Sequence, residues 1–438
     1  MSSVRLILLA GGSSSRFNPL KEKNLFKFLG KTIVRHQVEQ FSRHGFEDIT
    51  IVCSSENLPS IREEAALISK DVVILEQQGE GQAGAVLTAL ESFPASSPLL
   101  IVNMNDIFDE SLFEKFNSHV QRFADENVLV GFHVSDYFPG GYLVLEGDFV
   151  VDVLEKPGEG NEPSQFVRLV FDYFSDSSRL HEALKQASSS KDDVYEVALA
   201  NLMDEGQKFR MIKHDGTWKT IKYPWHVLSM MEYFLNSIEG ISISETAQVS
   251  ESAKIYGPVI IESGVKVMDN AVIRGPVYIG ANTVIANASL VRNSMVGAQC
   301  VVGFATEIAR SYIGDNCWFH TNYIGDSILG TNVSFGSGAV TANLRLDEQN
   351  IKMNIKGEAI DTGINKLGVV IGNNVRIGVN TSILPGIKIG QKTFVGTGVL
   401  VDSDIEDTKF VYVKQEKEIR DNRFDITTIS REDLKKKI

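Results

Sequence analysis

The sequence predicts two units of different fold class, an α/β domain followed by a parallel β-helix. Two patterns support this prediction. In the first half, apolar runs alternate with stretches of helical spacing, and in the second half an aliphatic residue returns at every sixth position. Strand–helix alternation is typical of a doubly wound, Rossmann-like α/β domain. A period of six is neither helical nor that of an ordinary strand, and it is typical of a parallel β-helix.

Four apolar runs in the first half have the length and composition of buried strands: Val4 to Leu9, Ile49 to Cys53, Val72 to Leu75 and Leu99 to Val102. Amphipathic helical stretches separate them, which favours a doubly wound sheet. Ligands of such sheets bind at the carboxyl ends of the strands, so the loops after these runs are expected to contain the chemistry. Pro224 and the helical spacing that follows it to Leu235 predict a helix that ends this domain.

The six-residue period is strict from Ile371 to Val401 and can be followed back to Val249 with single-residue slips. Each aliphatic side chain is expected to fill the axis of one coil, and the stacked coils leave outer faces that can pair with other chains. Two interruptions stand out. His320 replaces a small residue, and a polar excursion runs from Asn343 to Gly368. Such breaks of a local rule often mark functional sites.

We therefore expect an α/β domain over residues 1–238, a β-helix over residues 239–413 and a charged tail over residues 414–438. A chain of 438 residues with 43% hydrophobic and 23% charged residues has enough apolar content for two cores. The net charge of −13 argues against nucleic acid as a partner, because binding to a phosphate backbone needs a basic face.

The 3 cysteines lack C-x-x-C spacing, which predicts reduced, buried thiols in a cytoplasmic protein. No stretch approaches the ~20 apolar residues of a membrane span, so no membrane partner is expected.

The loop after the first predicted strand runs from Ala10 through Gly11, Gly12 and Ser13 to Arg16. Glycine lets the backbone approach a polyphosphate closely, loop amides can bind an anion, and arginine supplies a forked donor for phosphate oxygens. The loop is not a P-loop, because no Gly-Lys-Ser/Thr follows. From these residues alone, a triphosphate site and a plain strand-to-helix connector both remain open.

The pattern G-G-x-x-x-R-x-x-P-L, followed by Lys23, resembles the signature of sugar-1-phosphate nucleotidylyltransferases, and the resemblance extends from Val4 to Leu235. It implies transfer of a nucleotidyl group from UTP or dTTP to a hexose or hexosamine 1-phosphate, with release of pyrophosphate. The resemblance implies that Arg16 and Lys23 take part in catalysis and bind phosphate, and that Asp106 binds Mg²⁺. It implies that Glu155 and Lys156 contact the sugar phosphate. The residues implied to bind the nucleotide are Ala10, Gly11, Gly12, Gln77 and Gly79. Mg²⁺ prefers one or two carboxylates plus substrate oxygens, so Asp106 with few protein partners is chemically sufficient.

Three positions depart from this family. Thr220, in the segment Trp218 to Lys222, aligns with the second metal ligand, which is usually Asp or Asn in a W-x-D-I-G context. Arg168 begins a segment that replaces the usual Asn-Ala-Gly, and Leu143 replaces a sugar-facing Gly. Thr220 is a candidate weak metal ligand through its hydroxyl, and Asp172 is an alternative carboxylate.

In the β-helix, the run from His320 to Asp326 and the later Gly-rich coil with Asn343 resemble the acetyltransferase half of bifunctional N-acetylglucosamine-1-phosphate uridylyltransferases, particularly the archaeal type. The resemblance implies a left-handed parallel β-helix and a homotrimer. It implies that His320 is the general base that deprotonates an amino-sugar phosphate, whose amine then attacks acetyl-CoA. Imidazole suits this task because its unperturbed pKa of about 6.5 lies near working pH. The remaining implied roles are acceptor binding by Arg292, Arg310, Tyr323, Asn343 and Lys352, and oxyanion and acetyl-CoA binding near Ser337.

Ala309 and Gln349 stand where this family usually has Lys, so glucosamine 1-phosphate, galactosamine 1-phosphate and a hydroxyl acceptor all remain open. The sequence predicts a bifunctional sugar-nucleotide enzyme that makes UDP-N-acetylhexosamines. One alternative is an acetyltransferase whose N-terminal domain binds a sugar nucleotide without turnover. A second alternative, from a different class, is a non-catalytic trimeric scaffold.

Overall fold

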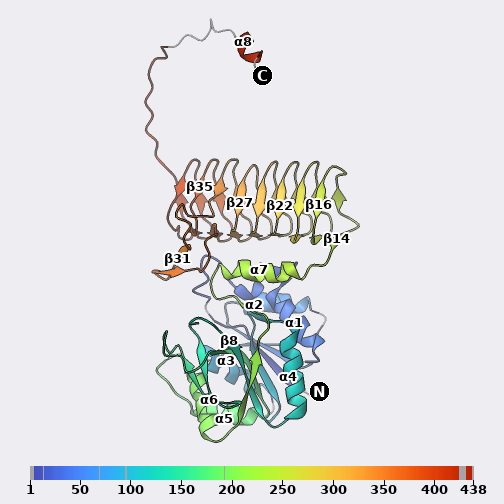
Figure 1. The fold of residues 1–438 in the computed structure, drawn as a ribbon, viewed down its shortest axis with the longest axis vertical. Helices are drawn as coiled ribbons and strands as arrows, with labels where there is room; N and C mark the ends of the chain where they lie inside the picture. The colour runs from blue at the N-terminus through green and yellow to red at the C-terminus, as the bar shows by residue number, and fades with distance from the viewer. Residues whose placement is uncertain are drawn as a thin grey trace.

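The structure is a computed structural model that describes residues 4–12, 14–68, 70–93, 96–191, 193–423 and 431–436. Ser13 of the first loop therefore lies outside the described residues. The α/β domain and the β-helix lie against each other, with helix α7 (His226–Asn236) between them (Figure 1).

A mixed sheet forms the centre of the α/β domain, in the strand order β5-β4-β1-β6-β11-β8-β12-β10-β9. The strands predicted from apolar runs are parallel neighbours: β1 (Arg5–Leu9), β4 (Ile49–Cys53), β5 (Val73–Glu76) and β6 (Leu99–Asn103). The sheet is completed by β8 (Asn127–His133), β9 (Gly141–Glu146), β10 (Phe149–Glu155), β11 (Phe166–Phe174) and β12 (Phe209–His214). The predicted α/β fold is confirmed, with β11 antiparallel to β6 and β8.

Alternate side chains of the central strands face opposite layers of helices, because successive residues of a strand point to opposite faces. Leu6 and Leu8 of β1 share a core with α1 (Ile33–Arg43), α2 (Leu58–Ala66) and α4 (Glu110–Arg122). Ile7 and Leu9 share the opposite core with α3 (Gly81–Leu90), α5 (Ser177–Gln186) and α6 (Val194–Asp204). Short elements near the sheet edge are η1 (Lys23–Leu25), β2 (Lys27–Phe28), β3 (Lys31–Thr32), β7 (Asp106–Phe108) and β13 (Trp218–Thr220).

The second half is a left-handed parallel β-helix, built from short parallel strands that stack coil upon coil. The sheet nearest the α/β domain, the domain-facing sheet, comprises β14 (Ile241–Ile243), β17 (Val259–Ile261), β20 (Val277–Ile279), β23 (Met295–Val296), β26 (Tyr312–Ile313), β28 (Ile328–Leu329), β33 (Val370–Ile371) and β36 (Lys388–Ile389). A second sheet is called the histidine sheet here, because His320 lies just before its strand β27. It comprises β16 (Lys254–Tyr256), β19 (Val272–Arg274), β22 (Leu290–Arg292), β25 (Glu307–Ala309), β27 (Tyr323–Gly325), β30 (Val340–Thr341), β35 (Ser382–Ile383) and β38 (Leu400–Val401). The outer face comprises β15 (Gln248–Val249), β18 (Lys266–Val267), β21 (Val284–Ile285), β24 (Val301–Val302), β29 (Ser334–Phe335), β34 (Arg376–Ile377), β37 (Phe394–Val395) and β39 (Phe410–Val411).

The aliphatic residue of each six-residue repeat fills the axis of the β-helix, as predicted. Ile371 and Ile389 are fully buried in the same core as Val291 and Ile324. Phe319 is also fully buried in this core. Phe319 therefore keeps the axis position of its coil, and only the next residue, His320, departs from the repeat.

The two domains share an apolar core. Phe28 stacks on Phe234 of α7 at a ring-centroid distance of 5.1 Å and lies 5.7 Å from the ring of Tyr312 in the domain-facing sheet. The polar excursion of residues 343–368 contains a hairpin of β31 (Lys352–Ile355) and β32 (Glu358–Asp361). Its residues Ile351 and Met353 are buried in the same core. The excursion thus packs against the junction of the two domains.

All 3 cysteines lie within the described residues and are buried free thiols, as predicted. Burial raises the pKa of Cys53 to about 11, which keeps it protonated at neutral pH. In the part of the chain that the structure describes, no helix is both long and apolar enough to cross a lipid bilayer.

Candidate functional sites

The loop after β1 is fixed at its first residue. The carbonyl of Ala10 accepts hydrogen bonds from the side chains of Asn24 at 3.1 Å and Asn57 at 2.9 Å. Beyond this anchor, Gly12 has a φ of 101°, a left-handed conformation that favours glycine, and Arg16 is exposed. The loop can therefore present its amides and the Arg16 guanidinium at the carboxyl edge of the sheet.

The loop after β5 meets the loop after β1. A Cβ added to Gly11 would overlap Oε1 of Gln77, so these two residues are in direct contact. The Gln77 side chain donates to the carbonyl oxygens of Gly79 at 3.1 Å and Gly81 at 3.0 Å. The structure brings together the residues that the sequence assigned to nucleotide binding.

Asp106 lies at the centre of the same edge. Strand β7 pairs antiparallel with β13, which places Thr220 directly opposite Asp106. Asp106 is buried, and burial raises its pKa against the opposing effects of a hydrogen bond from Thr220 and the positive charge of Lys23. Burial lowers the pKa of Lys23, with Asp106 opposing this shift and Arg16 adding to it. Residues predicted to bind metal and phosphate therefore share one site.

The donors around Asp106 fit a magnesium ion that is shared with substrate. They are one carboxylate and, across the strand pair, the hydroxyl of Thr220. Mg²⁺ in phosphoryl-transfer sites is commonly bound through one or two carboxylates, with water and phosphate oxygens as the remaining ligands. Among the described residues, no group of three or more His, Cys, Asp or Glu side chains could hold a metal ion by itself.

Asp172, the alternative carboxylate, does not belong to this site. It is fully buried and bound to Arg168 through contacts of 3.2 Å and 2.5 Å, and it accepts a hydrogen bond from Tyr195 at 3.1 Å. Arg168 also donates to Glu196 at 2.8 Å. Burial opposes the charge of Arg168, but the two carboxylates raise its pKa above its ordinary value. Leu143, another departure from the family pattern, is likewise fully buried.

The buried cluster around Arg168 and Asp172 leads to a prediction about the stability of the fold. Arg168→Met leaves Asp172 without its cation, and we expect the free energy of unfolding to fall by about 3 kcal/mol, because a buried charge that loses its partner is costly. Urea denaturation followed by circular dichroism measures the change. The control Arg179→Met, at an exposed position, should stay within about 0.5 kcal/mol of the parent chain. Equal stability of Arg168→Met and the parent would contradict the prediction.

Glu155 and Lys156, at the end of β10, reach the same site from the other side. Their side chains form an ion pair with a distance of 2.7 Å between Lys156 Nζ and Glu155 Oε1. Both charges act on Lys222, as do those of Arg16 and Lys23. The predicted nucleotide and sugar-phosphate residues are therefore close enough to serve one reaction.

Lys222 is a residue of this site to which the sequence analysis assigned no role. Its Nζ donates to the carbonyl of Pro139 at 3.0 Å. Burial, and then the charges of neighbouring cations, lower its pKa to about 8. The available signal in the sequence was a lysine at the last position of the segment aligned with W-x-D-I-G.

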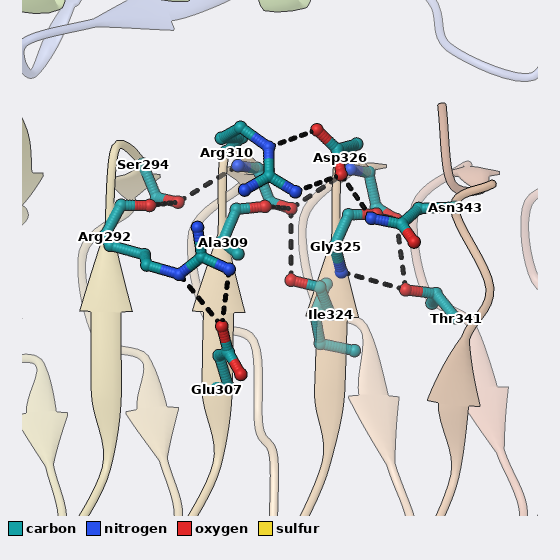
Figure 2. A network of polar contacts seen from close by, with 12 residues as sticks. Arg292, Ser294, Glu307, Ala309, Arg310, Ile324, Gly325, Asp326, Thr341 and Asn343 are labelled. Carbon is teal, nitrogen blue, oxygen red and sulfur yellow. Dashed lines mark hydrogen bonds and ion pairs between the residues drawn. The ribbon is translucent and has the colours of Figure 1, made fainter. Parts of the chain in front are cut away.

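The second site lies on the histidine sheet of the β-helix, where Figure 2 shows a network of polar contacts across neighbouring coils. Arg292 pairs with Glu307 at 2.8 Å. Arg310 forms a two-pronged pair with Asp326, with both contacts at 2.6 Å. The amide of Asn343 donates to Asp326 and, at 3.2 Å, to the hydroxyl oxygen of Tyr323 (Figure 2 shows the first of these).

This network fixes the predicted acceptor residues relative to one another. Parallel pairing stacks Arg292 on Ala309 and Ala309 on Gly325, so the charged side chains come from successive coils. Bidentate arginine–carboxylate pairs are directional as well as strong. The guanidinium of Arg310 is therefore oriented by Asp326 in the absence of substrate.

His320 precedes the strand that carries Tyr323. Its backbone is held at both ends, because its N–H donates to the Asn322 side chain at 2.8 Å and its carbonyl accepts from Thr306 at 2.6 Å. The residue is exposed, and its imidazole has no hydrogen-bond partner among the described residues. The main chain is fixed while the ring nitrogens remain open to a substrate.

Ser337 lies in the coil beside His320. The N–H of Gly338 donates to the carbonyl of Thr321 at 2.9 Å, and the N–H of Gly336 donates to Ile377 at 2.8 Å. Within the described residues, the N–H of Ser337 has no such acceptor. Of the backbone amides around Ser337, its own is the one left for an oxyanion.

Lys352 is not brought into contact with this network. It is exposed on the hairpin β31–β32, and its backbone carbonyl lies beside Gly386. No ion pair or hydrogen bond among the described residues joins its ammonium to Arg310, Tyr323 or Asn343. Asp326 and Asn322, to which the sequence analysis gave no roles, organise the site instead.

The close packing of Tyr323 and Asn343 around Gly325 leads to a second prediction. A Cβ added to it would lie 2.6 Å from the Tyr323 hydroxyl oxygen and 2.8 Å from the Asn343 amide nitrogen. We expect Gly325→Ala to push these groups apart and to raise KM for the amino-sugar acceptor about tenfold, the effect of losing one hydrogen bond to a polar ligand. Thiol release from acetyl-CoA measures it, and pyrophosphate release by the same chain serves as the control. Unchanged KM and kcat would contradict the expected role.

Family models match both halves of the chain. Residues 5–221 match the family model described as nucleotidyl transferase, and residues 238–360 match the one described as GMPPB C-terminal domain. A protein named bifunctional protein GlmU from Methanococcus maripaludis is 33% identical over 94% of this chain and 97% of its own. A protein named bifunctional sugar-1-phosphate nucleotidylyltransferase/acetyltransferase from Sulfurisphaera tokodaii is 30% identical over 92% of this chain and 98% of its own.

A third relative, named bifunctional protein GlmU from Methanocaldococcus jannaschii, is 30% identical over 94% of this chain and 98% of its own. These similarities extend across both domains at their full length. The chain therefore belongs to the family of bifunctional sugar-1-phosphate nucleotidylyltransferases/acetyltransferases.

Proposed function

We propose that the α/β domain transfers a nucleotidyl group from UTP or dTTP to a sugar 1-phosphate, and that the β-helix transfers an acetyl group from acetyl-CoA to an amino-sugar 1-phosphate. The observation that supports this most is the convergence of Arg16, Lys23, Asp106 and Lys156 at the carboxyl edge of the sheet. Cations from separate segments around one carboxylate suit two phosphorylated substrates and a metal ion.

In the nucleotidyl reaction, an oxygen of the sugar 1-phosphate attacks the α-phosphorus of the nucleotide. The bond from that phosphorus to the bridging oxygen breaks, and pyrophosphate leaves with the electron pair. Arg16 and Lys23 bind the phosphates and neutralise their charge, and Gln77 and Gly11 contact the nucleobase. Asp106 and Thr220 would hold Mg²⁺, which supplies charge neutralisation when bound.

In the acetyl reaction, His320 takes a proton from the amino group of the sugar, because an ammonium has no lone pair with which to attack. The amine nitrogen then attacks the thioester carbonyl, and the N–H of Ser337 stabilises the oxyanion. The carbon–sulfur bond breaks, and the CoA thiolate leaves and takes up a proton. Tyr323 and Asn343 orient the sugar.

The phosphate of the acceptor is the group that Arg292, Arg310 and Lys352 would bind. Both arginines are already paired with carboxylates, so their charge is partly neutralised. An acceptor phosphate would therefore use the guanidinium N–H groups that these carboxylates leave open. The exposed Lys352 has no such partner among the described residues and would supply a full positive charge from the hairpin.

We also propose a homotrimer. Large aromatic side chains lie exposed along the outer face of the β-helix: Trp318 is 53% exposed, Phe394 52% and Phe410 66%. Phe394 and Phe410 are direct neighbours in this face, and exposed apolar surface of this kind is typical of a protein–protein interface. Light scattering after gel filtration should give three times the chain mass of 48.3 kDa. A mass of 48.3 kDa would reject the assembly.

We propose that the functional units are residues 1–238, 239–413 and 414–438, in a protein of the cytoplasm that binds small-molecule substrates. The ends of the structural elements support these boundaries. Helix α7 ends at Asn236, strand β14 begins at Ile241 and strand β39 ends at Val411.

The experiment that tests the proposed function measures both reactions in one preparation. Pyrophosphate release is followed with UTP or dTTP, Mg²⁺ and a panel of sugar 1-phosphates. Thiol release is followed with acetyl-CoA and glucosamine 1-phosphate or galactosamine 1-phosphate. Activity in both assays is expected. Thiol release alone would replace the proposal with an acetyltransferase whose α/β domain lacks turnover, and silence in both would leave a scaffold.

A further inference from the structure

The nucleotidyl site contains an unusual concentration of positive charge. The charges of Arg16, Lys23 and Lys156 all act on Lys222, and that of Arg16 also acts on Lys23, although these residues come from four separate segments of the chain. Lys156 has Glu155 as an ion-pair partner, and Lys23 is near Asp106. Like charges repel, so such a cluster favours the binding of an anion.

Lys222 is partly buried and, like Lys23, forms no ion pair with an acidic side chain among the described residues. No carboxylate of the described residues lies within ion-pair distance of its Nζ. The ammonium donates to the Pro139 carbonyl at 3.0 Å and lies 5.1 Å from the centre of the Phe138 ring. An ammonium has three donors, so two remain for another ligand.

The position of Lys222 is fixed from its own segment as well. Its backbone nitrogen lies 3.2 Å from Nδ1 of His226, the first residue of α7, and the same Nδ1 lies 3.1 Å from the carbonyl oxygen of Thr220. The side chain therefore leaves a short, anchored segment that also places Thr220 against Asp106. Lys222 lies on the boundary between the phosphate-binding loop and the Glu155–Lys156 pair.

We propose that Lys222 is a further phosphate-binding residue of the nucleotidyl site, which binds the α-phosphate of the nucleotide where the sugar phosphate attacks it. This inference rests on the proposed nucleotidyl transfer. In the segment aligned with W-x-D-I-G, Thr220 lacks the negative charge of a carboxylate and Lys222 adds a positive charge. The chain thus carries a fixed cation beside a weakened metal ligand, and nucleotide binding should depend less on Mg²⁺.

The test is calorimetric titration of the full chain with UTP, once with Mg²⁺ and once with EDTA. For Lys222→Ala in EDTA we expect Kd for UTP to rise about tenfold, the effect of losing one charge-assisted hydrogen bond. Lys222→Arg should retain most of the affinity, because it keeps the charge. Lys213→Ala, an exposed lysine paired with Asp215, should bind UTP as the parent does. Thermal unfolding of each variant, followed by circular dichroism, reports whether the chain has folded.

The outcomes separate this inference from the proposed function. Pyrophosphate release by the parent together with unchanged UTP affinity in Lys222→Ala overturns the inference alone. UTP binding that depends on Lys222, without pyrophosphate release for any sugar 1-phosphate, supports the inference and overturns nucleotidyl transfer. A parent chain that, in the same titration, binds neither UTP nor dTTP under either condition overturns both.

Discussion

His320→Ala is expected to slow acetyl transfer by about 10²- to 10⁴-fold, the usual value of a positioned general base. The expected loss is in kcat, because the imidazole acts on the proton of the amine and the acceptor is bound by other residues. The main chain at His320 is held through Asn322 and Thr306, so removal of the ring should leave the coil intact. Thiol release from acetyl-CoA with glucosamine 1-phosphate measures the effect.

His133→Ala is the matched control, because this histidine is exposed on the α/β domain and bonds to Gln165 at 3.1 Å. It should leave thiol release unchanged. Pyrophosphate release by His320→Ala should also equal that of the parent, since the site at Asp106 is in the other domain. Acetyl transfer at the parental rate in His320→Ala would rule out this residue as the base.

Asp106→Asn is expected to lower kcat for pyrophosphate release by about 10²- to 10³-fold, the range found when one charge-stabilising group is removed from an active site. Asparagine keeps the size of the side chain but removes the carboxylate charge that would hold Mg²⁺. The change also leaves Lys23 without the negative charge that now opposes the fall in its pKa. The assay uses UTP, Mg²⁺ and the sugar 1-phosphate on which the parent chain is most active.

Asp152→Asn, an exposed carboxylate in the same domain, is the control and should keep parental activity. Thermal unfolding by circular dichroism separates a lost catalytic group from a lost fold. If Asp106→Asn releases pyrophosphate at the parental rate and still depends on Mg²⁺, the metal is bound elsewhere.

The β-helix could be predicted almost residue by residue. Ile371 and Ile389 are buried because each coil has one inward position, and a six-residue period in the sequence records that position directly. His320 was visible as a break in the same period. The proposed acetyl-transfer site at His320, Tyr323 and Asn343, which come from adjacent coils, could therefore be predicted from the sequence. The hairpin that carries Lys352 was not, because the excursion follows no period.

The nucleotidyl site was predictable where a local pattern exists. The loop from Ala10 to Arg16 follows the first strand, and Asp106 follows the fourth predicted one, so both were expected at one edge of the sheet. Lys222 and Asp172 had no such pattern. Lys222 lies among cations from other segments of the chain, and Asp172 is buried in a cluster with Arg168, Tyr195 and Glu196, so both placements depend on contacts that no local pattern records.

Local sequence patterns suffice to predict the two fold classes, the axis of the β-helix and the motif residues, because periodicity and loop chemistry act over a few neighbouring residues. The tertiary structure alone decided which charges face one another. It paired Arg310 with Asp326, buried Asp172 against Arg168, and placed Lys222 near Arg16, Lys23 and Lys156. Electrostatic and packing contacts depend on the distance between side chains in space. The strand order and the contact between the two domains set these distances, and both exist only when the whole chain is folded.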